Sequence, residues 1–303
     1  MIEFVNAKIN IGLNIVGKRA DGYHDLETVF YPVGLRNGLP AVPYPFCDVM
    51  EISERNADDP EGYELRNVRF IFGGDSIDCD PEKNLVVKGV KRMIEYSEAN
   101  GMKIDLPPLT MRLEKHLPSG AGMGGGSADC VAAMKLMRLK LQEYGYAVPD
   151  DDMLRGIAAG LGADCAVFVA NRAAYAEGIG DVLEPLEDFL AGKWVVVVKP
   201  DIFISTAAAF AGVTVARPAE SLRRLIERPI EEWKDCIVND FEPSLFPVYP
   251  ELERLKTALY AEGAIYASMT GSGAALYGIF HDEETAQKAC QNIDAPYKTL
   301  LQL

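Results

Sequence analysis

Residues 117–127 read Leu-Pro-Ser-Gly-Ala-Gly-Met-Gly-Gly-Gly-Ser, and a segment with helical character, Ala128 to Tyr144, follows them directly. Five of the seven residues from Gly120 to Gly126 are glycine, so backbone N–H groups can converge where no Cβ blocks close approach or positive φ. The unpaired donors and the positive dipole end of the following helix also favour an anion. The stretch therefore predicts a phosphate-binding loop, the glycine loop, with Ser127 at the N-cap and within reach of a phosphate-bound metal. A flexible linker is disfavoured, because linkers do not usually open directly into an apolar helix.

The flanks of the glycine loop narrow the kind of phosphate site. The chain has no G-x-x-x-x-G-K-[ST], which excludes an ordinary P-loop. Gly120, Gly122 and Gly125 satisfy the dinucleotide pattern G-x-G-x-x-G, but that pattern follows an apolar strand, and residues 112–118 are half charged or polar. No apolar strand ending in an acidic residue follows about twenty residues later. An NAD- or NADP-dependent oxidoreductase is therefore a disfavoured alternative.

Length and composition bound the class of protein. The 303 residues are enough for two domains, and 30 basic against 45 acidic residues give a net charge of −15, so we expect no nucleic-acid partner. Six scattered cysteines without a C-x-x-C pair, and only three histidines, predict reduced thiols in a cytoplasmic protein and no zinc site. We expect neither a signal peptide nor a membrane span, because Glu3 and Lys8 interrupt the N-terminal apolar residues and the longest apolar runs are short.

Residue patterns place the main elements. Alternating apolar and polar residues predict a half-buried strand over 8–15, with Lys8, Asn10 and Asn14 on its polar face. A turn follows at 19–24, and the Pro-rich stretch 35–47 predicts an irregular excursion. A change of pattern near Asn171-Arg172 predicts a phosphate-binding domain at 1–172 and an α+β domain at 173–303. Further helices are expected at 84–96, 149–161, 206–213, 219–227, 231–240, 250–262 and 283–292, and further strands at 109–113, 165–170, 194–198, 264–269, 274–280 and 297–303.

Four short motifs accompany the glycine loop: Ala7-Lys8-Ile9-Asn10, Arg19-Ala20-Asp21-Gly22-Tyr23-His24, Leu161-Gly162-Ala163-Asp164 and Thr270-Gly271-Ser272-Gly273. Singly, each has an ordinary structural explanation: a solvated strand face, a surface loop, a helix-end turn and a hairpin turn. Together and in this order, they resemble the 4-diphosphocytidyl-2-C-methyl-D-erythritol kinase family, within the superfamily of galactose, homoserine, mevalonate and phosphomevalonate kinases. The glycine loop and Thr-Gly-Ser-Gly mark the superfamily, whereas Ala-Lys-x-Asn followed by Arg-x-Asp-Gly-Tyr-His marks the family. The match spans positions 7 to about 280, nearly the whole chain.

The resemblance implies an α+β, two-domain small-molecule kinase fold with its active site in the interdomain cleft. It also implies ATP-dependent phosphorylation of a hydroxyl of 4-diphosphocytidyl-2-C-methyl-D-erythritol, giving the 2-phosphate and ADP in the non-mevalonate route to isoprenoid precursors. ATP, Mg²⁺ and a cytidine diphosphate-linked polyol are then the expected ligands. The sequence favours neither a monomer nor a homodimer and leaves the metal coordination open.

Residue by residue, the resemblance implies a catalytic pair at Lys8 and Asp164. The carboxylate accepts the hydroxyl proton, and the lysine holds it ionised and stabilises the developing alkoxide. The implied ATP-binding residues are Pro118, Ser119, Gly120, Ala121, Gly122, Met123, Gly124, Gly125, Gly126 and Ser127, with Asn84, Leu85 and Lys115 at the adenine end. The implied acceptor-binding residues are Tyr23 and Phe210, which sandwich the cytosine ring, His24 and Asn10, which hydrogen-bond the acceptor, Thr206, and Gly271 and Ser272 near the transferred phosphate.

Two features depart from the family pattern. The stretch 35–47 is longer than the usual connection, and Cys165-Ala166 stands where an apolar residue and a proline are more usual. Neither removes a proposed catalytic group. The alternatives that stay open are another small-molecule kinase of the superfamily acting on a sugar or homoserine, the oxidoreductase, and a nucleotide-binding module without catalytic activity.

Overall fold

The computed structural model describes residues 1–36, 39–40, 46–74, 79–101 and 103–303. The chain forms two compact units. Unit 1 comprises Met1–Ala7, Asn37–Ser119 and Gly124–Asn171, and unit 2 comprises Lys8–Arg36, Gly120–Met123 and Arg172–Leu303.

The domain division at 1–172 and 173–303 stays a prediction, and the compact units of the structure are discontinuous in sequence. Residues 8–36 and 120–123 belong to unit 2, because the strands of 8–36 hydrogen-bond into a sheet with the strands that follow Arg172. Contacts between residues far apart in the sequence determine this division into units. The local sequence pattern contains no information about such contacts.

Unit 1 is built on one five-stranded sheet of order β1-β6-β9-β8-β7. Its strands are β1 (Ile2–Val5), β6 (Asp48–Glu54), β7 (Tyr63–Leu65), β8 (Val68–Gly74) and β9 (Leu109–Lys115). Only β8 and β9 run parallel among the paired strands described for this sheet. Unit 1 also contains the short strand β5 (Leu39–Pro40). The predicted excursion at 35–47 falls largely outside the described residues, since 37–38 and 41–45 are not among them.

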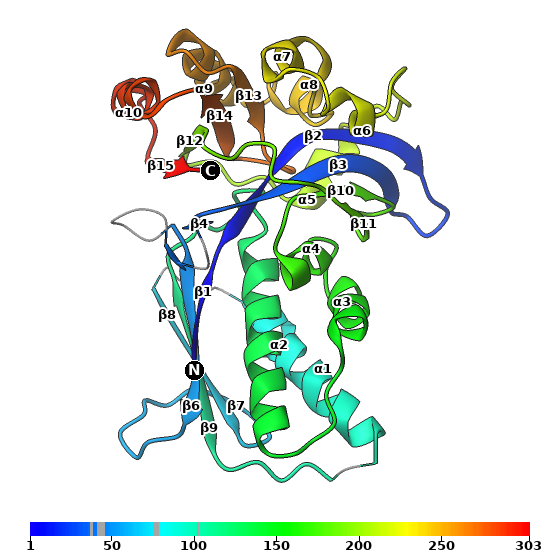
Figure 1. The fold of residues 1–303 in the computed structure, drawn as a ribbon, viewed down its shortest axis with the longest axis vertical. Helices are drawn as coiled ribbons and strands as arrows, with labels where there is room; N and C mark the ends of the chain where they lie inside the picture. The colour runs from blue at the N-terminus through cyan, green and yellow to red at the C-terminus, as the bar shows by residue number, and fades with distance from the viewer. Residues whose placement is uncertain (37–38, 41–45, 75–78, 102) are drawn as a thin grey trace. The chain divides into compact units, whose positions relative to one another are not determined.

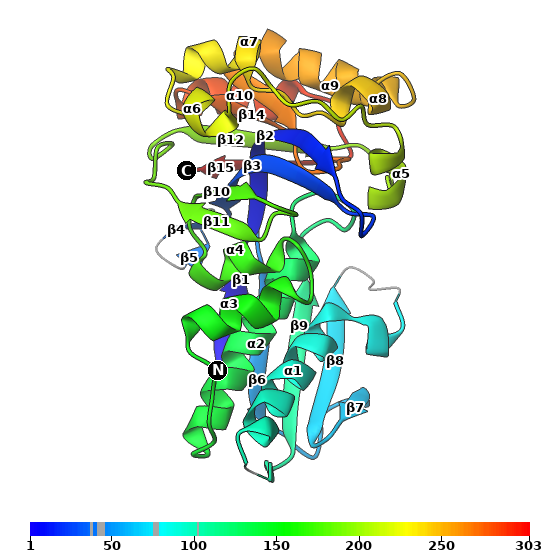
Figure 2. The ribbon, with the colours of Figure 1, turned by 90° about the vertical axis from the view of Figure 1, so that its right-hand side faces the viewer.

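Helices cover one face of this sheet, where α1 and α2 lie side by side (Figures 1 and 2). Asn84 caps α1 through its side chain, and Asp150 caps α3, so Pro149 precedes this helix and is not in its first turn. The unit 1 helices are η1 (Pro81–Lys83), α1 (Leu85–Ala99), α2 (Gly125–Glu143), α3 (Asp151–Ala159) and α4 (Cys165–Ala170).

The strand prediction at 165–170 is wrong, because this segment is the helix α4. A short apolar run has no periodicity that separates a buried strand from a buried helix. Five of its six residues are buried, so burial on all sides removes the polar face that marks an amphipathic helix.

Unit 2 contains two four-stranded sheets. The first, of order β11-β10-β3-β2, joins β2 (Ala7–Lys18) and β3 (His24–Val33) to β10 (Ala174–Glu177) and β11 (Val182–Pro185). The second, of order β13-β14-β12-β15, is formed by β12 (Trp194–Lys199), β13 (Tyr266–Met269), β14 (Leu276–Phe280) and β15 (Tyr297–Gln302). All pairings in the second sheet are antiparallel, with Val196 opposite both Gly278 and Leu300.

The helices α9 and α10 pack on the second sheet (Figure 1). Gly278 permits close contact with α9, since a Cβ there would lie 3.0 Å from Leu259 Cδ2. The buried cluster between them includes Val196, Leu255 and Leu276. The remaining elements are β4 (Leu35–Arg36), α5 (Thr206–Ala211), α6 (Leu222–Leu225), η2 (Ile230–Glu232), α7 (Trp233–Cys236), α8 (Glu242–Leu245), α9 (Pro250–Ala261) and α10 (Glu283–Asn292). Within the described residues, no helix is long and apolar enough to traverse a bilayer.

Candidate active site

The first strand of unit 2 holds Lys8 in a fixed position. Its Nζ donates hydrogen bonds to Asn10 Oδ1 at 2.5 Å and to the Gly122 carbonyl oxygen at 3.0 Å. The ammonium also lies 5.1 Å from the centre of the Phe30 ring, a cation–π distance. The Lys8 backbone N–H donates to Met123 O at 3.0 Å, so main chain and side chain both contact the first half of the glycine loop.

The predicted strand at 8–15 is present, but its polar face is not solvated. Lys8 and Asn10 are each 1% exposed, and Asn14 is 5% exposed. These side chains occupy a buried polar layer, which alternation alone cannot distinguish from a solvated face. A buried lysine requires hydrogen-bond partners, and the contacts of Lys8 supply them.

Asn10 is oriented by three neighbours. Its Nδ2 donates to Thr28 Oγ1 at 2.9 Å, and Thr28 Oγ1 in turn donates to Gly12 O at 2.6 Å. Its backbone N–H donates to Thr270 Oγ1 at 3.0 Å, and its carbonyl oxygen accepts from the Tyr277 hydroxyl at 2.8 Å. Because the amide NH₂ is used by Thr28, the amide oxygen must face Lys8.

The Thr-Gly-Ser-Gly loop lies against the first half of the glycine loop in unit 2. Ala274 N and Ala275 N donate to Gly120 O and Ala121 O at 3.1 and 3.3 Å. Gly122 has φ +70°, and a Cβ there would collide with the Thr270 carbonyl oxygen, so only glycine fits. The predicted residues Lys8, Asn10, Gly120–Met123 and Gly271 are thus brought together.

Asn239, which the sequence analysis did not single out, supports this loop. Its Nδ2 donates to Met269 O at 2.8 Å and to Gly271 O at 2.9 Å, and its Oδ1 accepts from Phe241 N at 3.0 Å. Thr28 and Tyr277 were missed in the same way. Each is a polar residue inside an apolar strand or turn pattern, a weak signal that does not name a partner.

The second half of the glycine loop belongs to unit 1 and leads into α2. Gly124 is the N-cap with φ +70°, and α2 begins at Gly125. Ser127 is therefore in the first helical turn, and the prediction of Ser127 as N-cap is wrong, because Gly124 can adopt the left-handed conformation that starts the helix three residues earlier. The N–H groups of Gly125, Gly126 and Ser127 stand at the open end of a 19-residue helix.

Two other predicted segments of unit 1 converge on this helix end. A Cβ on Gly162 would lie 3.2 Å from Cys165 Sγ, 3.7 Å from Ser127 Oγ and 3.9 Å from Leu85 Cδ1. Asp164 follows two residues later and directly precedes α4. The start of α1, the first turn of α2 and the segment that carries Asp164 are therefore neighbours.

Lys115, which was predicted to lie at the adenine end of the nucleotide, forms ion pairs with two carboxylates of the protein. This lysine is 6% exposed, and its Nζ forms ion pairs with Asp48 and, at 2.8 Å, with Asp129. Asn84 uses its side-chain oxygen to cap α1, accepting from Val86 N at 2.8 Å. Contacts of Asn84, Leu85 and Lys115 with a nucleotide stay a prediction.

The predicted acceptor residues of unit 2 lie partly together. The His24 ring stacks on Phe210 with centroids 4.9 Å apart and an interplanar angle of 19°, and Phe210 meets Phe241 edge-on. Tyr23, which precedes His24, is 60% exposed, and Thr206 is the exposed first residue of α5. An aromatic surface is present, with His24 on the face of Phe210.

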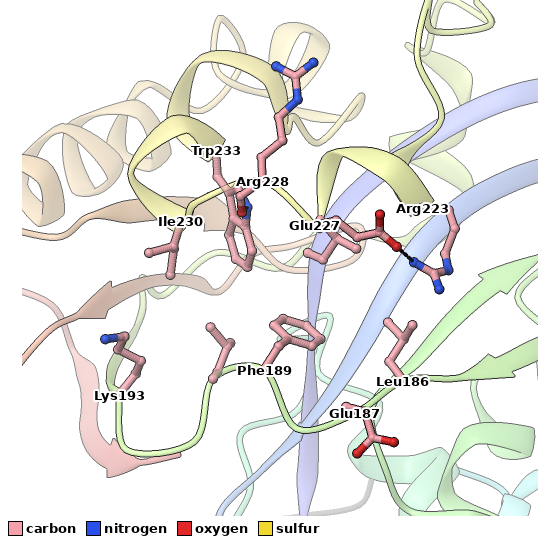
Figure 3. Close-up of a pocket in the computed structure, with 11 residues that line it drawn as sticks. Leu186, Glu187, Phe189, Lys193, Arg223, Glu227, Arg228, Ile230 and Trp233 are labelled. Carbon is pink, nitrogen blue, oxygen red and sulfur yellow. Dashed lines mark hydrogen bonds and ion pairs between the residues drawn. The ribbon is translucent and has the colours of Figure 1, made fainter.

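A pocket of about 480 Å³ elsewhere in unit 2 is lined by none of the predicted residues (Figure 3). Trp233 faces Phe189 there, and the two ring centroids are 6.0 Å apart. Arg223 at its rim is already paired with Glu227. An apolar floor with paired charges does not favour phosphate, and we do not assign the chemistry to this pocket.

Comparison with known proteins decides the family. Residues 84–172 match the model described as GHMP kinases N terminal domain, and residues 219–299 match GHMP kinases C terminal. A 4-diphosphocytidyl-2-C-methyl-D-erythritol kinase of Bacteroides fragilis is 44% identical over 288 residues, which cover 95% of both chains. One from Porphyromonas gingivalis is 43% identical over 292 residues, again 95% of both.

The chain belongs to the 4-diphosphocytidyl-2-C-methyl-D-erythritol kinase family. It is accordingly an ATP-dependent kinase, and the predicted family is confirmed.

Solved structures support the fold of this kinase family member. The crystal structure of a 4-(cytidine 5'-diphospho)-2C-methyl-D-erythritol kinase aligns with TM-score 0.69 at 27% identity, covering 96% of this chain and 94% of that one. The mevalonate kinase of Methanococcus jannaschii aligns with TM-score 0.67 at 13% identity, covering 100% and 98%, which shows the fold alone. The predicted α+β fold of the superfamily is confirmed.

Proposed function

We propose that this chain transfers the γ-phosphoryl group of ATP to a hydroxyl of 4-diphosphocytidyl-2-C-methyl-D-erythritol, giving the 2-phosphate and ADP. The main support for the proposal is the position of Lys8. Its buried ammonium group is held against the first half of the glycine loop by hydrogen bonds to Asn10 and to the Gly122 carbonyl oxygen. Such a cation next to a phosphate cradle suits a reaction in which negative charge is moved.

The glycine loop supplies donors for the phosphates. The N–H groups of Gly125, Gly126 and Ser127 open the long helix α2, whose dipole favours an anion at that end. A glycine at position 122 also lets the backbone approach a ligand closely. Backbone donors that belong to a helix and its cap need little reorganisation during the transfer.

Asp164 is proposed as the group that accepts the hydroxyl proton. A neutral alcohol must lose its proton as the phosphoryl group arrives, and a positioned carboxylate contributes about 10²–10⁴ in rate. Lys8 would balance the charge of the Asp164 carboxylate and of the developing alkoxide.

Mg²⁺ is proposed to accompany the nucleotide. The described residues contain no group of three or more His, Cys, Asp or Glu side chains placed to hold a metal by themselves. This fits a Mg²⁺ bound chiefly by phosphate oxygens and water, as is common for nucleotide sites. Ser127, in the first turn of α2, is the hydroxyl that would reach it, and the metal would neutralise phosphate charge.

The cytosine ring is proposed to stack on Phe210, with Tyr23 on its other face. Stacking contributes about 1–3 kcal/mol per base, whereas polar contacts to the base edge select cytosine. Because the His24 ring covers Phe210, His24 would have to move aside, which leaves its ring nitrogens available to hydrogen-bond the acceptor.

A coupled ADP-release assay with four acceptors tests the function. We expect turnover with 4-diphosphocytidyl-2-C-methyl-D-erythritol and at least about 10³-fold lower kcat/KM with galactose, mevalonate or homoserine, because these acceptors leave the polar groups of a cytidylyl site unpaired. ADP release of equal efficiency with one of the three would contradict the proposal. Thermal protection by a non-hydrolysable ATP analogue, but not by NAD or NADP, distinguishes the kinase from an oxidoreductase.

A further inference from the structure

Two buried carboxylates in unit 1 meet at one lysine beside the glycine loop. Lys115 ends β9, Asp48 begins β6, and Asp129 lies in the second turn of α2. The lysine is 6% exposed, Asp48 is fully buried and Asp129 is 2% exposed. Lys115 Nζ donates to an oxygen of each carboxylate. Burying three charged groups costs desolvation free energy, which is repaid only when the ion pairs and hydrogen bonds among them have good geometry. Most charged residues therefore stay at the surface.

Asp48 also holds the entry to the glycine loop. Its second oxygen accepts backbone N–H bonds from His116 at 2.6 Å and from Leu117 at 2.7 Å. The main chain that leads from β9 into the glycine loop is thereby tied to the start of β6.

Lys115 and Asp129 hold the exit of the same loop. A Cβ on Gly125 would lie 3.1 Å from Lys115 Nζ, so the ammonium rests against the first residue of α2. Asp129, four residues later on the same helix, accepts from that ammonium at 2.8 Å. The helix start and the strand end are thus joined through one cation.

We propose that Asp48 and Asp129 are positioning residues for ATP, which through Lys115 fix the two ends of the glycine loop relative to each other. This role requires no contact of either carboxylate with the substrate. The inference rests on the proposed function only in taking the glycine loop as the nucleotide site. We call Asp48, Lys115 and Asp129 the clamp. If either carboxylate is lost, one end of the glycine loop is no longer held, and the backbone N–H donors of the loop lose their common alignment.

A double-mutant cycle on nucleotide affinity tests the clamp. The variants are Asp48→Asn, Asp129→Asn and the pair, each isosteric, so that the amide oxygen introduced at position 48 can still accept the two backbone bonds. Asp151→Asn is the matched control, because Asp151 is an unburied carboxylate of unit 1 in an ion pair with Arg138. Calorimetry gives the Kd of a non-hydrolysable ATP analogue for each purified variant.

Each single clamp variant should raise that Kd about tenfold. The Kd of the double variant should exceed that of the weaker-binding single variant by less than about twofold, since both carboxylates act through Lys115. The control should bind like the wild type. Kd values within about twofold of the wild type in both single variants, or losses that multiply in the pair, would overturn the proposal.

Hydrogen exchange separates positioning from general loss of folding. In Asp129→Asn the amides of residues 119–127 should exchange faster while those of β6 keep their protection. Equal acceleration in both segments would mean that the cluster serves only stability and would reject a positioning role. A wild type that binds the analogue but does not phosphorylate the cytidylyl acceptor would instead refute the proposed function and leave the clamp intact.

Discussion

Lys8 Nζ donates a 3.0 Å hydrogen bond to the carbonyl oxygen of Gly122, a residue 114 positions later in the chain. This contact joins the first strand of unit 2 to the first half of the glycine loop. The backbone at position 122 has φ +70° and passes directly beside Thr270, which is why this position must be glycine. The Lys8 side chain and the first half of the glycine loop therefore support each other.

Gly122→Ala should destabilise the protein, because the new methyl group collides with the Thr270 carbonyl and the backbone conformation is strained for alanine. We expect Tm to fall by about 5 °C or more. Gly126→Ala is the matched control, since a Cβ at position 126 meets nothing within 4 Å. Its Tm should be unchanged or higher, because alanine favours the helix. Equal Tm values for the two variants would contradict this account of the loop.

Thr28→Val should lower both stability and turnover. The change keeps the shape but removes the acceptor for Asn10 Nδ2 and the donor to Gly12 O, at a cost of about 1–3 kcal/mol for unpaired buried groups. The Asn10 amide is then free to turn away from Lys8. Thr28→Ser retains the hydroxyl and should recover most of the turnover. Failure of serine to restore kcat more than valine does would argue against this role for the hydroxyl.

Tyr23→Ala should raise the KM for the cytidylyl acceptor more than the KM for ATP. Tyr23 is 60% exposed and directly precedes the His24 that stacks on Phe210, so it has little to contribute to stability. Loss of one stacking face corresponds to about 1–3 kcal/mol, or roughly 5- to 150-fold in KM. Initial rates with each substrate varied in turn measure this. A larger effect on ATP would place the nucleotide, and not cytosine, at Tyr23.

Asp129 gives the protein a specific pH dependence of stability. Burial raises its pKa to about 7; Lys115 opposes the shift and Asp48 adds to it. The folded state therefore binds this proton more tightly than the unfolded state, whose pKa is about 4. The contribution of this group to the free energy of unfolding is therefore fully present below about pH 4 and is lost as pH rises through about 7.

Asp129→Asn removes that dependence, so the Tm of the variant minus the Tm of the wild type should become more positive between about pH 5 and pH 8. Scanning fluorimetry across this range measures the difference. Asp151→Asn is the control, because a hydrogen bond from Arg138 lowers the pKa of Asp151 and keeps this carboxyl ionised throughout that range. A difference that is constant for Asp129→Asn, or that falls with pH, would refute the assignment.

Local pattern was enough to predict several features of the fold. The glycine loop and its helix, the strand around Lys8 and the helix at 283–292 are all present, because periodicity and clustered glycine are local signals. The division of the glycine loop between the two units was not predictable, since it follows from hydrogen bonds such as that of Ala274 N with Gly120 O.

Buried polar networks escaped prediction for the same reason. Asp48 starts a strand 67 positions before Lys115, and nothing in either local pattern indicates that they pair. Asn239 stands 32 positions before Gly271, which it supports. A resemblance to a family predicts residues that contact substrate, whereas these buried contacts emerge only from coordinates.

Single-turnover formation of the 2-phosphate shows whether Lys8 and Asp164 act together in one phosphoryl transfer. Wild type, Lys8→Gln, Asp164→Asn and the double variant are compared with ATP and the cytidylyl acceptor at saturation. Asp164→Asn should lose about 10²–10⁴ in rate while its affinity for the ATP analogue changes little. The double variant should be scarcely slower than the slower single variant, because residues that act as a unit are not additive. A near-normal rate in Asp164→Asn, or losses that multiply in the double variant, would contradict the account.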